Sequence, residues 1–275
     1  MLKTRVMTAA VLLAVLLSAL FLLPKYAWIA FCALFLGLSA WEWGALVALT
    51  AVGRLIYSAF LVGFFVLPGI LETPGANATY APAWVYHAAA LFWIVLVPVW
   101  IGRQQRVDGR VAMLATGAVV LVPAFAALVD LRGIHPFLLV AVLGTVWISD
   151  TAAYFVGRRF GRRKLAPSIS PGKTWEGVAG ALAAVGLYAL AWAGLSAPES
   201  TPAWPSTMRV ASTWILPVLL GLAVVGMIGD LFESLIKRQA GVKDSGTLLP
   251  GHGGILDRID APVAMLPLAA LAFMR

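Results

Sequence analysis

Long apolar segments separated by short polar ones dominate the pattern of hydrophobic and polar positions along this chain. Most are close to the roughly 20 residues that an α-helix needs to cross a bilayer, and none alternates as a membrane β-strand does. We therefore expect an all-α, polytopic transmembrane helix bundle. The pattern predicts about nine spans, at residues 6–23, 26–48, 53–71, 83–101, 111–130, 135–156, 176–196, 212–232 and 259–274.

The first segment follows basic residues, as a signal peptide does, but no small-residue cleavage site and soluble domain come after it. We interpret it as a retained span. The composition agrees with a membrane protein: 61% of the 275 residues are hydrophobic and 12% are charged, against about 25% charged residues in a soluble domain. Soluble, disordered and coiled-coil classes are thereby excluded. The single cysteine, Cys32, cannot form an internal disulfide.

Most lysines and arginines fall on one side of the predicted membrane. With nine spans, all but four of the 20 fall on the side that holds the N-terminus and the loops near 49–52, 102–110, 157–175 and 233–258. The positive-inside rule makes that side cytoplasmic and accounts for the net charge of +8 without a nucleic-acid partner. The basic run at 158–164 is also expected to attract anionic lipid headgroups.

Carboxylates are costly in a membrane chain and therefore mark function. Asp150 lies inside an apolar span, whereas Asp230, Asp257 and Asp260 lie near the ends of the last two spans. The alternation of spans brings all four to the cytoplasmic face, next to many of the cations. Acids that can hold a hard cation beside bases that can hold phosphates indicate a phosphoryl-transfer site in a cytoplasm-facing polar cavity.

The polar motifs point to a family. Residues 230–260 contain Ser234-x-x-Lys237-Arg238, Lys243-Asp244, Leu249-Pro250-Gly251-His252-Gly253-Gly254 and Asp257-Arg258-x-Asp260. This pattern resembles the signature of phosphatidate cytidylyltransferases, also called CDP-diacylglycerol synthases. Two upstream motifs resemble the same family: Asp150-x-x-Ala153-Tyr154-x-x-Gly157-Arg158 and Ser170-Pro171-x-Lys173-Thr174-x-Glu176-Gly177. The similarity runs from about 147 to 262, and Trp41-Glu42-Trp43 adds a weaker match.

The resemblance implies that CTP and phosphatidate give CDP-diacylglycerol and pyrophosphate in phospholipid biosynthesis, with Mg²⁺ required. One or two metal ions fit, and a monovalent cation is left open. The implied metal ligands are Asp230 and Asp257 first, then Asp150 and Asp260. The implied catalytic residues are Asp230, Asp257, Lys173, Lys237, Arg238 and His252. The implied substrate-binding residues are Arg158, Ser170, Lys173, Thr174, Glu176, Ser234, Lys243, Asp244, Gly251, Gly253, Gly254 and Arg258.

The predicted organisation is about five N-terminal spans in 1–134 and a catalytic membrane region in 135–275. The expected partners are CTP, phosphatidate and membrane lipids, with a homodimer possible, and the expected location is the cell (inner) membrane. The alternatives are an enzyme that uses CTP on another lipid phosphate, a CTP-dependent lipid kinase, and a transporter with the acids as an ion site. Transport is disfavoured because the charges gather near one face and no internal repeat is visible.

Overall fold

The computed structural model describes residues 2–71, 79–107, 109–195, 212–249, 251 and 253–274. Every predicted span is helical. The helices are α1 (Leu2–Leu22), α2 (Lys25–Leu46), α3 (Ala51–Leu71), α4 (Ala83–Leu91), η1 (Phe92–Leu96), α5 (Val97–Arg103), α6 (Arg110–Ile134), α7 (Pro136–Phe160), α8 (Trp175–Leu195), α9 (Ser212–Gln239) and α10 (Leu256–Phe273). The all-α fold class is confirmed.

Seven helices of the described chain are long and apolar enough to cross a membrane: α2, α3, the continuous α4–η1–α5 rod, α6, α7, α8 and α9. Of the remaining two, α1 contributes a shorter apolar stretch, Met7–Leu22, and α10 carries three charged residues in its first two turns. The number of nine spans therefore stays a prediction.

Two local features were not predicted. A five-residue π-helical turn, η1, interrupts the 83–101 span just before Pro98, which has no N–H to donate to the preceding turn. The loop after α7 forms an antiparallel hairpin of β1 (Lys164–Ala166) and β2 (Ser170–Thr174).

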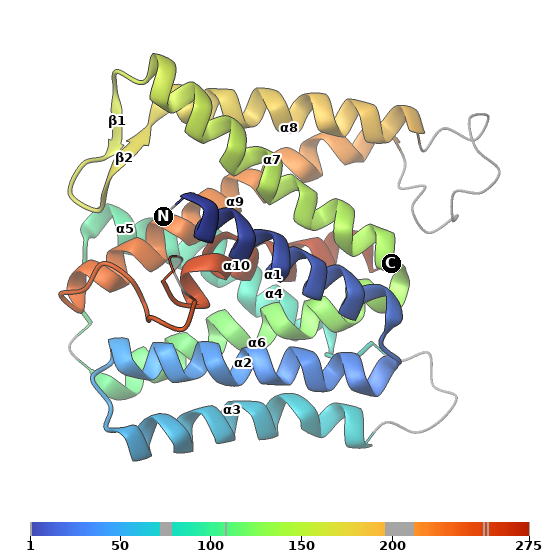
Figure 1. The fold of residues 1–275 in the computed structure, drawn as a ribbon, viewed down its shortest axis with the longest axis vertical. Helices are drawn as coiled ribbons and strands as arrows, with labels where there is room; N and C mark the ends of the chain where they lie inside the picture. The colour runs from blue at the N-terminus through green and yellow to red at the C-terminus, as the bar shows by residue number, and fades with distance from the viewer. Residues whose placement is uncertain are drawn as a thin grey trace.

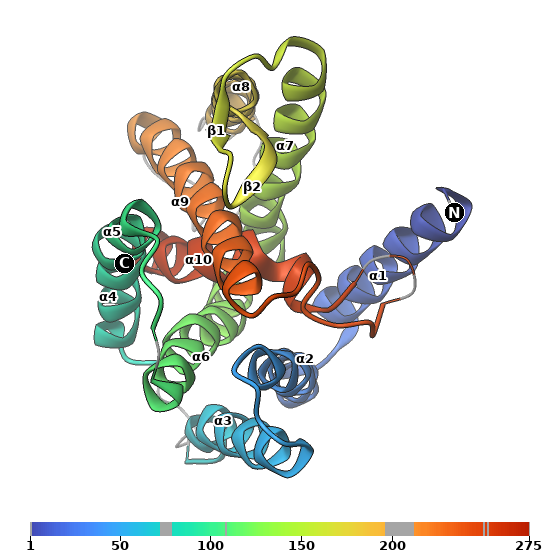
Figure 2. The ribbon, with the colours of Figure 1, turned by 90° about the vertical axis from the view of Figure 1, so that its left-hand side faces the viewer.

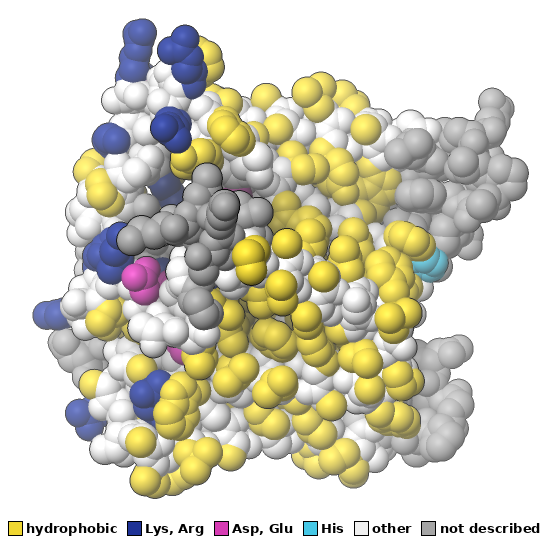
Figure 3. All heavy atoms as spheres, in the orientation of Figure 1, with side chains coloured by type: hydrophobic (Ala, Val, Ile, Leu, Met, Phe, Trp, Pro, Cys, Tyr) yellow, Lys and Arg dark blue, Asp and Glu magenta, His cyan; other side chains and the backbone are white. Residues whose placement is uncertain are grey.

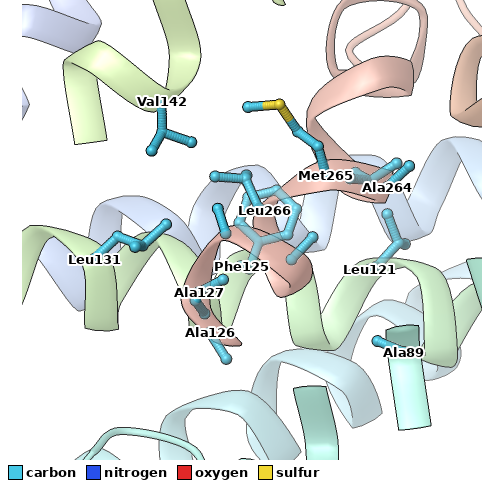
Figure 4. Packing of buried hydrophobic residues seen from close by; sticks show 14 of the residues in the cluster. Ala89, Leu121, Phe125, Ala126, Ala127, Leu131, Val142, Ala264, Met265 and Leu266 are labelled. Carbon is cyan, nitrogen blue, oxygen red and sulfur yellow. The ribbon is translucent and has the colours of Figure 1, made fainter. Parts of the chain in front are cut away.

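Helix α10 is the centre of the bundle, and α9, α6, α4 and α7 surround it (Figure 2). Leu266 and Met265 of α10 pack against Phe125 of α6 and Val142 of α7 in the apolar core (Figure 4). In α9, a Cβ atom at Gly229 would lie 2.6 Å from the Cβ of Ala264 and from the carbonyl oxygen of Asp260. Glycine thus lets α9 and α10 approach closely, as small residues do in membrane bundles.

The hairpin, the C-terminal ends of α5, α7 and α9, the described residues of the loop 240–255 (240–249, 251 and 253–255) and the start of α10 lie together at one end of the bundle (Figure 1). We call this the site end. Lysine and arginine side chains gather there, while hydrophobic side chains cover the middle of the same face (Figure 3). The loops that the charge pattern assigned to one side therefore do lie at one end of the molecule.

Candidate active site

A buried lysine joins the last two helices. The Lys237 ammonium, near the end of α9, lies 2.8 Å from the Glu233 carboxylate one turn earlier and 2.6 Å from the Asp257 carboxylate of α10. Lys237 is only 9% exposed, so its charge depends on these two carboxylates for compensation. Asp230, Glu233, Ser234 and Lys237 share one face of α9, as this pair and the Ser234–Asp230 hydrogen bond of 3.5 Å show.

Asp257 also organises the loop before α10. Its second oxygen accepts hydrogen bonds from the backbone N–H groups of Ser245 and Gly254, at 2.9 and 2.8 Å. Partial burial raises the pKa of Asp257, but the Lys237 ammonium and these two donors outweigh burial, so that the pKa lies below its usual value. Gly253 has a φ of +80°, and a Cβ there would lie 2.6 Å from the Asp257 carboxylate. The motif therefore needs glycine at this position.

A second ion pair connects the hairpin to α9. The Lys173 ammonium, on β2, lies 2.6 Å from the Asp230 carboxylate. Asp150, on α7, interacts electrostatically with both, and Asp260 of α10 interacts with Asp230, Glu233 and Lys237. Together these residues form what we call the acid–lysine cluster: Asp150, Lys173, Asp230, Glu233, Lys237, Asp257 and Asp260.

The charge of this cluster suits a cation. The cluster contains five carboxyl groups and two ammonium groups, and it lies at the edge of an apolar bundle, where charges are weakly screened. Among the described residues, no group of three or more His, Cys, Asp or Glu is placed to hold a metal ion. Mg²⁺ at nucleotide sites takes only one or two carboxylates, together with substrate phosphates and water.

Two predicted substrate-binding residues support the hairpin that presents Lys173. Thr174 is buried, and its hydroxyl accepts a hydrogen bond from the N–H of Gly177 in the first turn of α8. The Glu176 carboxylate accepts hydrogen bonds from the backbone N–H groups of Arg162 and Arg163. Direct contact of either residue with substrate stays a prediction.

The other predicted residues surround the cluster at the site end. Arg238 is exposed and contacts the carbonyl oxygens of Ile169 and Val242 at 3.5 Å. Arg158 is exposed on the last turn of α7, where it donates to the Tyr154 hydroxyl. Further positions lie on the hairpin, in the loop 240–255 or at the start of α10: Ser170, Lys243, Asp244, Gly251, Gly254 and Arg258. His252 lies outside the described residues.

A carboxylate that the sequence analysis did not place in the site is central to it. Glu42 of α2 is 2% exposed. It accepts hydrogen bonds from the Ser245 hydroxyl at 3.0 Å and from the N–H groups of Ile255 and Leu256 at 3.0 and 2.9 Å. A side chain at Gly254 would collide with it. Glu42 thus holds the start of α10, and with it Asp257, against the N-terminal half of the chain.

We expect Glu42→Gln to lower turnover about 10- to 100-fold, the range that follows when a positioned group loses its supporting shell. The amide replaces one acceptor oxygen with a donor that faces the N–H groups of Ile255 and Leu256. Initial rates of the purified protein at saturating substrates test this expectation, with Glu42→Asp as the variant that keeps the charge and recovers part of the rate. Unchanged turnover in Glu42→Gln would show that the start of α10 is held without this carboxylate.

Comparison with known proteins identifies the family of this chain. A family model described as "Cytidylyltransferase family" matches residues 3–274. The chain belongs to the cytidylyltransferase family. It is 41% identical to a phosphatidate cytidylyltransferase of Pseudomonas aeruginosa, over 98% of this chain and 96% of that protein. It is 36% identical to a phosphatidate cytidylyltransferase of Haemophilus influenzae, over 97% and 96% of the two chains.

A phosphatidate cytidylyltransferase of Thermotoga maritima is 39% identical over 48% of this chain and 47% of that protein. The cytidylyltransferase match extends beyond the motif-bearing residues 147–262, because it includes the N-terminal helices and therefore Glu42. The family resemblance read from the motifs is confirmed.

Proposed function

We propose that this chain is an integral-membrane enzyme that transfers the cytidylyl group of CTP to phosphatidate, which gives CDP-diacylglycerol and pyrophosphate. The relatives named above carry this activity in their names. The observation that carries the proposal is the acid–lysine cluster, which brings Asp150, Lys173, Asp230 and Asp257 from four separate elements to one end of an apolar bundle. The product belongs to phospholipid biosynthesis.

The reaction needs positively charged groups beside the phosphates more than it needs a general base. An oxygen of the lipid phosphate bonds to the α-phosphorus of CTP, and the bond from that phosphorus to the β-phosphate oxygen breaks, so that pyrophosphate leaves. A phosphomonoester has a second pKa of about 6, so the nucleophile is already ionised at neutral pH. Lys173 and Lys237, which come from different segments, can neutralise the phosphates of the two substrates.

The proposed metal is Mg²⁺, which would stabilise charge that develops on the phosphates. Asp230, with Asp150 and Asp260 nearby, would supply its carboxylate oxygens. A carboxylate offers about four acceptor positions, and Asp257 uses three of them for Lys237, Ser245 and Gly254. Asp257 therefore retains a position for the metal while it orders the loop.

The choice of acceptor lipid tests the proposed function against its nearest alternative. Purified protein in mixed micelles is incubated with CTP, Mg²⁺ and either phosphatidate or diacylglycerol. We expect a CDP-lipid from phosphatidate and no lipid product from diacylglycerol. A new phosphatidate pool formed from diacylglycerol would instead identify a CTP-dependent lipid kinase.

We further propose that the site end faces the cytoplasm, where CTP is available, and that the chain lies in the cell (inner) membrane. A cysteine at Ser168, exposed on the hairpin, should react with an impermeant maleimide only in inverted vesicles. A cysteine at Thr79, exposed before α4 at the opposite end, should react only in right-side-out cells. The native Cys32 is buried and should not react with the maleimide. Labelling of both positions from the same side would refute this topology. The homodimer stays a prediction.

A further inference from the structure

A long apolar cavity of about 410 Å³ lies between α1, α2, α6, α7 and α10. It falls within the size range of ligand pockets. Its wall includes Leu12 of α1, Trp28 of α2, Phe125 of α6 and Val263 of α10. Arg258, in the first turn of α10, is the only charged residue among the described residues that line it. We call this cavity the α1 groove.

The α1 groove and the acid–lysine cluster have residues on one face of α7. Leu143 and Trp147 line the groove, and Asp150 follows Trp147 by three positions. Residues at i, i+4 and i+7 share a helix face. Trp147 is 40% exposed, and Asp150 lies about one turn further along the same face, toward the site end. A molecule in the groove can therefore place its polar end near the cluster.

The length and polarity of the groove fit one leaflet of a bilayer. On α10 its wall runs from Arg258 to Leu266, which is about 12 Å at 1.5 Å per residue. Half of a hydrocarbon core of about 30 Å is about 15 Å. An apolar wall of this length with an arginine at the site end matches a lipid chain that hangs from an anionic headgroup.

We propose that the α1 groove holds one acyl chain of the phosphatidate, with Arg258 beside the lipid phosphate at its mouth. This inference rests on the proposed function and adds the location of the lipid subsite. Helix α1 is its outer wall, and its N-terminal half stands away from the rest of the bundle (Figure 2). The chain would enter laterally from the membrane between α1 and α7.

The first test fills the groove. Leu12→Trp places a larger ring at a lining position, and Val11→Trp is its matched control, since Val11 is 60% exposed and does not line the cavity. We expect Leu12→Trp to raise KM for dioleoyl phosphatidate about 10-fold, the loss that follows when about two methylenes lose their burial. Its turnover of dihexanoyl phosphatidate should equal that of Val11→Trp. Equal effects of the two variants, or equal effects on both lipids, would overturn the proposal.

The second test needs no turnover. Phosphatidate with a terminal photoreactive diazirine on one acyl chain is irradiated with the wild-type protein in nanodiscs, and labelled peptides are identified by mass spectrometry. We expect labels on α1, α7 and α10. Excess unlabelled phosphatidate present during irradiation should prevent this labelling, whereas excess phosphatidylethanolamine should not. Equal competition by phosphatidylethanolamine would mean that bulk lipid fills the groove. If the labels appear as expected but the protein makes no CDP-lipid, the proposed function is refuted and the lipid subsite is still supported.

Discussion

Asp230→Asn is expected to lower CDP-diacylglycerol formation about 10³-fold, the upper range for the loss of one preorganised electrostatic contact. Asparagine has nearly the shape of aspartate but no charge. It would leave the Lys173 ammonium without its partner at 2.6 Å and would remove the carboxylate that interacts with both Asp150 and Asp260. Initial rates over a range of Mg²⁺ concentrations test this prediction, and the half-saturating concentration should rise.

Asp130→Asn is the matched control. Asp130 is a buried carboxylate near the C-terminal end of α6, away from the site end, where it accepts hydrogen bonds from the Tyr86 hydroxyl and the N–H groups of Tyr80 and Ala81. This control should lower thermal stability and leave the Mg²⁺ dependence unchanged. An Asp230→Asn enzyme with wild-type turnover and unchanged Mg²⁺ dependence would place the metal elsewhere.

Lys237→Met is expected to combine a loss of stability with a loss of activity. The substitution leaves the Glu233 and Asp257 carboxylates close together without the ammonium that separates them. Removal of one member of a buried ion pair costs about 3–5 kcal/mol, which corresponds to a fall in Tm of roughly 10 °C. Turnover should fall at least about 10-fold, because Asp257 loses its anchor and a phosphate loses a charge-assisted contact.

Lys173→Met separates the two effects. The Lys173–Asp230 pair is partly exposed, with 24% and 31% of the side chains accessible, so its loss should change Tm little. Turnover should still fall at least about 10-fold, because this lysine is proposed to neutralise phosphate. Thermal unfolding and initial rates of the purified Lys173→Met and Lys237→Met variants test these expectations. Near wild-type kinetics in both would show that these lysines serve only topology and folding.

The positions of the helices were predictable because a membrane restricts the chain. Backbone groups in the bilayer must be satisfied within each segment, so a long apolar run becomes a helix whatever its neighbours are. The alternation of spans then places Asp150, Asp230 and Asp260 at one end without knowledge of any contact. The nearness of Lys237 and Asp257 was predictable in the same way, because the end of α9 and the start of α10 are adjacent ends of consecutive helices.

The role of Glu42 could not be predicted in the same way. It bonds to Ser245 and Leu256, 203 and 214 positions away, and no local pattern reports a contact at such separation. A carboxylate inside an apolar segment was the available signal. The hairpin that carries Lys173 was not predicted either, because the short polar segment 164–174 has no alternation of apolar and polar residues. Its position depends on hydrogen bonds that Glu176 and Thr174 accept from backbone N–H groups near its two ends.

The fate of the individual phosphates of CTP tests the central claim most directly. Purified protein is incubated with phosphatidate and Mg²⁺, and with CTP labelled either at the α- or at the γ-phosphate. The account predicts that the α-label enters the lipid as CDP-diacylglycerol, while the γ-label leaves as pyrophosphate in equal amount. Transfer of the γ-label to lipid, or no labelled lipid with either CTP, would contradict it.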